Sequence, residues 1–323
     1  MTALRLPTIP PWVLTIAAMF SIQLGSALSA GMMTTLGPIG TAWLRLTMGA
    51  LILLVLARPP LRTLRLSDIP AVVGLGIATG LMSVTFLAAM ERLPMGTAVA
   101  IEFLGPLSVA AIRGRGARSL VLPGTALAGV LLLTEPWLGS VDLIGVGYAG
   151  LGAVGWASYI LLTQRVGDRF NGIGALALTI PIAAAAVAPF GVPQALGSIS
   201  WNVIGVAAGL ALLIPVLPYI MEMTALRQMN HTAFGTLMAL EPAIGLLLGA
   251  IVLQQLPSPL QLLGLLLVVA AGAAAQRGGQ RSPHTSTPAR QAAFPPAIEN
   301  FAGDHRPETA SSLPQQCCEE GLT

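Results

Sequence analysis

Long apolar segments, separated by short charged or Pro/Gly-rich breaks, run through most of this chain. A helix that crosses the hydrocarbon core of a bilayer needs roughly 20 apolar residues. The breaks define ten such segments, of which the fourth and fifth are short enough to be partly broken or tilted. The expected spans are 12–33, 38–57, 69–90, 97–112, 119–134, 143–163, 172–190, 201–223, 232–253 and 259–276. This pattern predicts an all-α polytopic membrane protein with ten transmembrane helices.

Charged residues are too few to cover a water-soluble surface. They make up 9% of the 323 residues, against 54% hydrophobic residues, whereas soluble domains carry about 25% charged residues. Residues 277–323 differ from the rest, because they are rich in Pro, Ser, Thr and Gln and have too few apolar groups to form a core. We expect this segment to be a disordered cytoplasmic tail. Its adjacent Cys317 and Cys318 indicate neither a structural disulfide nor a metal site.

The placement of arginine predicts how the chain is oriented. Connections rich in arginine stay on the cytoplasmic side of a membrane. If the N-terminus is inside, one set of alternate connections holds ten arginines before the tail, and the other set holds only Arg92. We therefore expect both termini to be cytoplasmic and Glu135 and Asp142 to lie in an outside loop.

A shift of the chain on itself by 136 residues reveals an internal repeat. The shift places Leu104, Gly105 and Pro106 on Leu240, Glu241 and Pro242. Each half, 1–139 and 140–276, then holds five helices. Because five is an odd number, the second half must cross the membrane in the direction opposite to the first. Such inverted repeats are typical of alternating-access transporters that bind their solute near the midplane. A competing interpretation, a signal peptide cleaved around residues 26–30, would destroy this symmetry.

Four ionisable residues lie within the predicted spans: Arg45, Glu102, Glu222 and Glu241. Each costs roughly 2.5–3.5 kcal/mol at a helix centre on insertion scales, so such groups usually face a cavity or a partner. We consider all four as substrate-binding or coupling residues. Two structural alternatives stay open: Arg45 and a carboxylate could form a buried pair, and Glu222 could lie in the interface.

Prolines predict interruptions at matching positions of the two halves. Proline cannot donate the helical hydrogen bond, so Pro106 frees the carbonyl of Glu102 and Pro242 that of Met238. Paired interruptions of this kind point toward a binding site. An α-helix puts Ala98, Glu102 and Gly105 on one face, so we expect the small residues to leave room around the carboxylate for a ligand of amino-acid size.

Other residues could contact a solute or pack helices together. The polar and aromatic candidates at membrane depth are Gln23, Thr85, Trp156, Ser158 and Tyr159. Interhelical hydrogen bonds are an equally good explanation of most of them. His231 could take part in coupling, although a histidine at a helix end is more often a solvated cap. Close helix packing is expected at three pairs of glycines spaced by four: Gly76 and Gly80, Gly205 and Gly209, Gly245 and Gly249.

Four stretches in order resemble a known family. They are residues 96–107 (GTAVAIEFLGPL), 155–167 (GWASYILLTQRVG), 217–226 (LPYIMEMTAL) and 234–243 (FGTLMALEPA). They closely resemble the EamA-type branch of the drug/metabolite transporter superfamily, particularly its threonine/homoserine exporters.

That resemblance implies an inner-membrane, multi-pass permease of ten helices in two repeats, which exports small neutral amino acids in exchange for protons. It places Glu102, Glu222 and Glu241 inside matching motifs and Arg45 where the family commonly has arginine. It implies no cofactor, no metal and no nucleic acid, and it leaves a homodimer open.

Two other functions compete with this interpretation. The first is transport of another small metabolite or drug, against which the low aromatic content of 5% counts. The second is an intramembrane enzyme, for which the sequence offers no HExxH, no GxSxG and no Gly-rich phosphate loop.

Overall fold

The structure is a computed structural model, and it describes residues 10–57, 64–113, 118–135, 137, 142–167, 173–226, 228, 234 and 237–278. The chain divides into two units, Met1–Arg281 and Ser282–Thr323. The second unit, with Cys317 and Cys318, lies outside the described residues, and so does His231. Within the described residues the secondary structure is helical throughout, without a strand, as predicted.

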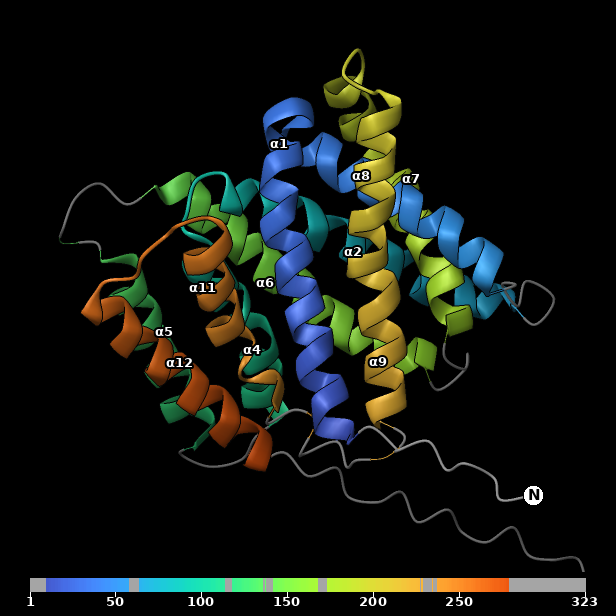
Figure 1. Ribbon diagram of the computed structural model, residues 1–323. Coiled ribbons are helices and arrows are strands. Elements are labelled where there is room, and N and C mark those ends of the chain that lie inside the picture. Colours follow the sequence, from blue (N-terminus) through green and yellow to red (C-terminus); the bar gives the residue numbers. More distant parts are fainter. Residues whose placement is uncertain are drawn as a thin grey trace, which may run out of the picture. The chain divides into compact units, whose positions relative to one another are not determined.

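Eleven α-helices are described, together with the short 3₁₀ helix η2 (Leu66–Asp68) and the π-helical turn η3 (Leu212–Val216). The α-helices in Figure 1 are α1 (Pro11–Leu56), α2 (Ile69–Met90), α3 (Met95–Glu102), α4 (Leu104–Arg113), α5 (Arg118–Thr134), α6 (Leu143–Gly167), α7 (Ile173–Ala195), α8 (Trp201–Ala211), α9 (Leu217–Leu226), α11 (Glu241–Val252) and α12 (Pro259–Gly278).

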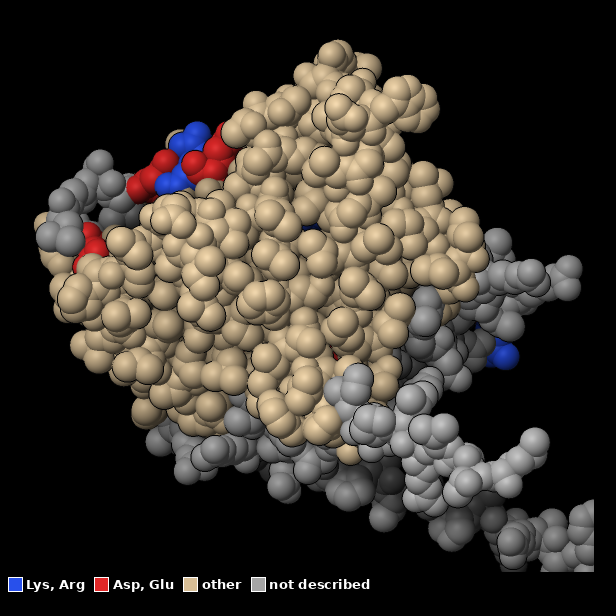
Figure 2. Space-filling view, in the orientation of Figure 1, with Lys and Arg blue, Asp and Glu red and all other residues tan. Residues whose placement is uncertain are grey.

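Five of the described helices are long and apolar enough to cross a membrane. They cover residues 11–56, 66–90, 143–163, 174–195 and 201–222, and shorter apolar helices cover 95–109, 121–134, 241–252 and 259–274. Large apolar side chains lie on the outside, such as Trp201 and Leu266, which are 87% and 63% exposed. Figure 2 shows a face made almost entirely of uncharged residues, with charged atoms gathered mainly at its edges. Such a surface suits lipid and not water.

The helix α1 contains two of the predicted spans and changes direction between them (Figure 1). Gly37 at this point has φ 68° and ψ 170°, a conformation that side chains disfavour, and Pro38 follows it. Gln194 at the end of α7 fills the space where a Cβ of Gly37 would stand, and its Oε1 accepts a hydrogen bond from the Gly40 N–H at 2.7 Å. The glycine therefore permits both the turn and the contact with α7.

Two other predicted spans are interrupted. Span 97–112 consists of α3 and α4, which are separated at Phe103, as its short length led us to expect. Span 201–223 loses helical geometry at Ile214, with φ −147° and ψ 115°, next to Pro215. Here the Ser21 Oγ donates a hydrogen bond to the Leu213 carbonyl at 3.0 Å. A side chain from α1 thus satisfies a backbone group beside the interruption.

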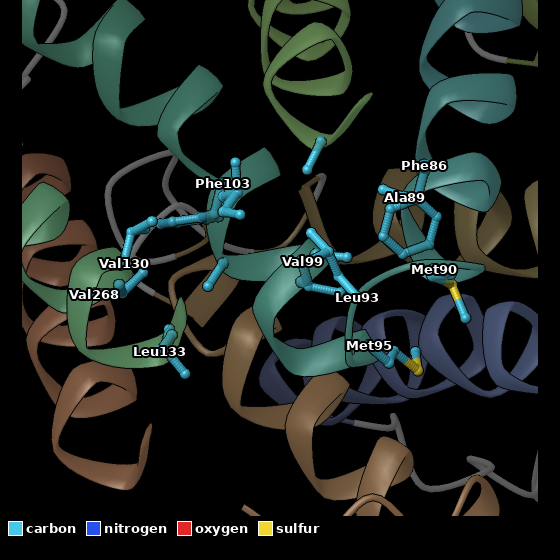
Figure 3. Close-up of a cluster of buried hydrophobic side chains, with 14 of the residues drawn as sticks. Phe86, Ala89, Met90, Leu93, Met95, Val99, Phe103, Val130, Leu133 and Val268 are labelled. Carbon is cyan, nitrogen blue, oxygen red and sulfur yellow. The ribbon is translucent and has the colours of Figure 1, made fainter. Parts of the chain in front are cut away.

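An apolar core surrounds α3. In Figure 3, Val99 of α3 lies in a cluster with side chains from α2, α5 and α12, among them Phe86, Val130 and Val268. Every residue of α3 is buried. This packing holds the end of α3, where Glu102 lies, in the interior.

Close packing at glycines agrees only in part with expectation. A Cβ on Gly76 would lie 2.6 Å from Ile182 of α7, and one on Gly245 would lie 3.0 Å from Val99 of α3. The expectation for Gly205 and Gly209 is not met within the described residues, none of which lies within 4 Å of a Cβ at either position. An equally close approach, which the spacing rule missed, joins α5 to α12: a Cβ on Gly129 would lie 2.6 Å from the Gly264 carbonyl.

Candidate functional site

Two buried carboxylates lie at helix ends created by the interruptions. Glu102 is the last residue of α3, and Glu241 is the first residue of α11. Pro106 lies three residues beyond the break at Phe103, and Pro242 lies in the first turn of α11. Glu102 is 7% exposed and Glu241 is 5% exposed, so both are more than nine-tenths buried. Since a helix N-terminus favours negative charge and a C-terminus does not, Glu241 has the more favourable backbone environment.

Gln23 of α1 connects to this pair of carboxylates. Its Nε2 donates a hydrogen bond to the Glu241 Oε1 at 3.4 Å, and the side chain is only 2% exposed. The charges of Glu102 and Glu241 are close enough to interact. We call Gln23, Glu102 and Glu241 the carboxylate cluster. Helices α1, α3 and α11, distant in the sequence, each contribute one member.

Three oxygens of the carboxylate cluster have no hydrogen-bond partner among the described residues. They are Gln23 Oε1, Glu102 Oε1 and Glu241 Oε2, all of them acceptors. Unpartnered buried acceptors are costly, and two like charges in a medium of low polarity are more so. The cluster therefore requires a proton or another cation.

The space beside Glu102 comes from a glycine of α6 and not from its own helix. A Cβ on Gly152 would lie 2.7 Å from Glu102 Oε1 and 3.3 Å from Thr85 Oγ1. The expected room at Gly105 is absent, because the Ala153 carbonyl of α6 occupies the position of its Cβ. The reason is that α3 ends at Glu102, so Gly105 belongs to α4 and serves helix packing instead.

The other polar candidates on α2 and α6 are engaged in different ways. The Thr85 Oγ1 donates to the Leu81 carbonyl at 2.8 Å, and the Ser158 Oγ donates to the Val154 carbonyl at 2.8 Å, both within one helix. Trp156 packs edge-to-face on Phe103, with 5.9 Å between the ring centroids, and so supports the break after Glu102. For Thr85 and Trp156 these contacts are structural.

Glu222 of α9 is a third carboxylate, which interacts electrostatically with Glu241. It is partly buried, and its charge lies close enough to interact with Glu241 and with Tyr159 of α6. Tyr219, one turn earlier on α9, is also near Glu222 and was missed by the sequence analysis. The three-residue spacing of Tyr219 and Glu222 on one helix was the available signal.

Arg45 lies in a separate buried place. It is 4% exposed, and its Nη1 donates to the Ser29 Oγ at 3.3 Å, while Ser29 donates to the Gly25 carbonyl. The alternative of a buried pair between Arg45 and a carboxylate is wrong within the described residues, where the one ion pair joins Arg92 to Asp142 at 2.9 Å. Ser29 was also missed, because serine is common in such helices and carries no positional signal.

Asp142 is held in place at the start of α6. Its Oδ1 accepts from the Gly145 N–H at 2.9 Å and its Oδ2 from Arg92 Nη1. The Gly145 N–H first, and then Arg92, lower the pKa of Asp142 below its ordinary value. This contact ties the connection after α2 to the beginning of α6.

A helical chain with a lipid-compatible exterior and carboxylates buried at interrupted helices belongs to the class of polytopic membrane proteins. A model of the EamA-like transporter family matches residues 143–274. Together with the relatives below, this match shows that the chain belongs to the EamA-like transporter family.

Two relatives share most of their length with this chain. The threonine/homoserine exporter RhtA of Escherichia coli (strain K12) is 37% identical over 272 residues, which cover 83% of this chain and 91% of the relative. The protein of the same name from Salmonella typhimurium (strain SL1344) is 35% identical with the same coverage. A solved crystal structure covers 82% of this chain and 98% of its own, with a TM-score of 0.56 and 20% identity. That last likeness shows a shared fold alone.

Proposed function

We propose that this protein is a secondary transporter of the inner membrane that exports small neutral amino acids of the threonine and homoserine type. The observation that carries the proposal is the 37% identity to a threonine/homoserine exporter over 91% of that relative's length. Membership of a transporter family also argues against the alternative of an intramembrane enzyme.

The proposed architecture is ten transmembrane helices in two inverted repeats, 1–139 and 140–276. Two observations support it. The helices α4 and α11 both begin just after an interruption, at Leu104 and Glu241, close to the repeat shift of 136 residues. Gly129 and Gly264, which meet where α5 crosses α12, are also separated by nearly that shift. Equivalent helices of the two halves would then pack on each other.

The proposed mechanism is proton-coupled alternating access, with both termini in the cytoplasm. Glu102, Glu241 and Glu222 are the proposed substrate or coupling groups, because buried carboxylates at helix interruptions are where such transporters bind solutes and ions. Arg45, which lies beside Ser29, remains a proposed substrate-binding or coupling residue outside this group. Gln23, Thr85, Trp156 and Tyr159 are proposed to shape the site around these groups.

Export of a panel of labelled amino acids from cells with and without the protein tests this function. Saturable export of threonine and homoserine that depends on the protein is expected. An unchanged panel, with the protein present in the membrane, contradicts the amino-acid assignment and favours another small metabolite or drug.

The orientation has its own test, in which single cysteines are labelled from outside intact cells. We expect no labelling at position 116 and efficient labelling at position 138. Labelling at 116 but not at 138 would reverse the proposed orientation.

A further inference from the structure

We propose that the carboxylate cluster is an ammonium subsite, at which Glu102, Glu241 and Gln23 bind the positively charged amino group of the solute. The inference rests on the proposed function and adds which end of the solute these residues recognise. Its basis is the set of three buried acceptor oxygens without a partner among the described residues, each from a different side chain and a different helix.

The chemistry of these three oxygens matches a primary ammonium group. Such a group carries one positive charge and three N–H donors, and the cluster offers one open acceptor on each of Gln23, Glu102 and Glu241. A carboxylate would find no donor at these atoms. Hard metal ions such as Ca²⁺ take six to eight oxygen ligands, and no group of three or more His, Cys, Asp or Glu suited to a metal occurs in the described part of the chain.

No described side chain supplies this cation. The chain has no lysine, and the buried arginine, Arg45, donates to Ser29 and forms no ion pair with either carboxylate. The hydrogen bond from Gln23 reaches Glu241 but leaves one oxygen of each carboxylate open. Among the described residues, the pair can therefore be neutralised only by a proton or by a cation from outside, and the amino group of the solute is such a cation.

Competition against labelled threonine on the purified full-length protein in liposomes tests the subsite. N-acetylthreonine lacks the positive charge, and threonine amide keeps it while losing the carboxylate. On the wild type we expect N-acetylthreonine to compete at least about tenfold more weakly than threonine, since a hydrogen bond to a charged group is worth that much. Threonine amide is expected to retain measurable competition.

The variants Glu102→Gln and Glu241→Gln should each weaken threonine binding by about tenfold or more and bring the ratio between N-acetylthreonine and threonine toward one. Glu91→Gln, at an exposed position, is the matched control and should keep the wild-type ratio. If either variant fails to fold, Gln23→Ala removes an uncharged acceptor and should also lower the ratio.

Three results overturn the subsite: a wild-type ratio near one, a wild-type ratio retained in the cluster variants, or unchanged threonine binding where transport is lost. The last result would assign the carboxylates to proton transfer alone. Failure of the proposed function is a different result, because the folded wild-type protein would then carry no threonine at all.

Discussion

The side-chain amide of Gln23 on α1 donates a hydrogen bond to the Glu241 carboxylate on α11, although 218 residues separate them in the chain. This contact connects the first helix to a helix that begins at a buried carboxylate. Because Glu102 of α3 lies close enough to interact with Glu241, three helices depend on one buried polar cluster.

Glu102→Gln is expected to abolish threonine export with little change in the amount of protein in the membrane. Glutamine preserves the shape of the side chain while removing its charge. Export assays and membrane immunoblots measure the two quantities separately. Normal abundance with undiminished export would show that the assignment is wrong and make Glu241 the next candidate, whereas loss of protein would indicate a structural role.

Gly152→Ala is expected to impair transport without removing any charge. The new Cβ would stand 2.7 Å from the Glu102 Oε1, so the carboxylate must move. We expect a loss of about tenfold or more in transport rate, because misplacement by about 1 Å can cost that much. Gly150→Ala on the same helix is the matched control, since nothing lies within 4 Å of its Cβ. Equal rates for the two variants would argue against a positioning role for Gly152.

Gly264→Val is expected to destabilise the protein at the crossing of α5 and α12. A Cβ on Gly264 would lie 2.9 Å from the Leu132 Cβ and 3.0 Å from the Leu133 backbone nitrogen, so the helices must separate. Overpacking of this kind typically costs about 1–3 kcal/mol. Thermal unfolding in detergent measures the change. Gly124→Val on α5, where the Cβ meets open space, corrects for helix propensity, and a similar shift in both variants would refute the packing explanation.

Asp142 should make stability depend on pH in the acid range. Its pKa is lowered in the folded state, first by the Gly145 N–H and then by Arg92. The resulting stabilisation is present above the ordinary pKa of aspartate, about 3.9, and is lost as the pH falls through the lower folded-state value. Asp142→Asn should therefore unfold more easily than the wild type at pH 7, with a difference that shrinks below about pH 4. The effect should be small, because both partners of the pair are exposed.

Arg92→Gln separates the effect of Arg92 on the pKa of Asp142 from the effect of the Gly145 N–H. Since the hydrogen bond from the Gly145 N–H, the first-ranked cause, remains in this variant, the variant should keep part of the pH dependence. Unfolding midpoints measured from pH 3 to pH 7 test this expectation. If Arg92→Gln removed as much of the pH dependence of stability as Asp142→Asn, a contribution from the Gly145 N–H would be contradicted.

The sequence by itself determined the buried acids, the helix at 69–90 and the interruption in span 97–112. Span 69–90 coincides with α2, and the expected weakness of span 97–112 appears as the break at Phe103. The reason is that the length of an apolar segment, and the lost hydrogen bond of a proline, act locally along the chain. The family resemblance likewise followed from local motifs, and the comparisons confirm it.

Only the tertiary structure decided which of these groups meet. It placed Gln23 on Glu241, set Arg45 apart beside Ser29, and gave the space next to Glu102 to Gly152 of another helix. It also packed Gly105 against Ala153 of α6, and it placed no described residue close to a Cβ on Gly205 or Gly209. The physical reason is that contacts between helices depend on how separate segments of the chain pack, and a pattern along one helix does not specify the face of its neighbour.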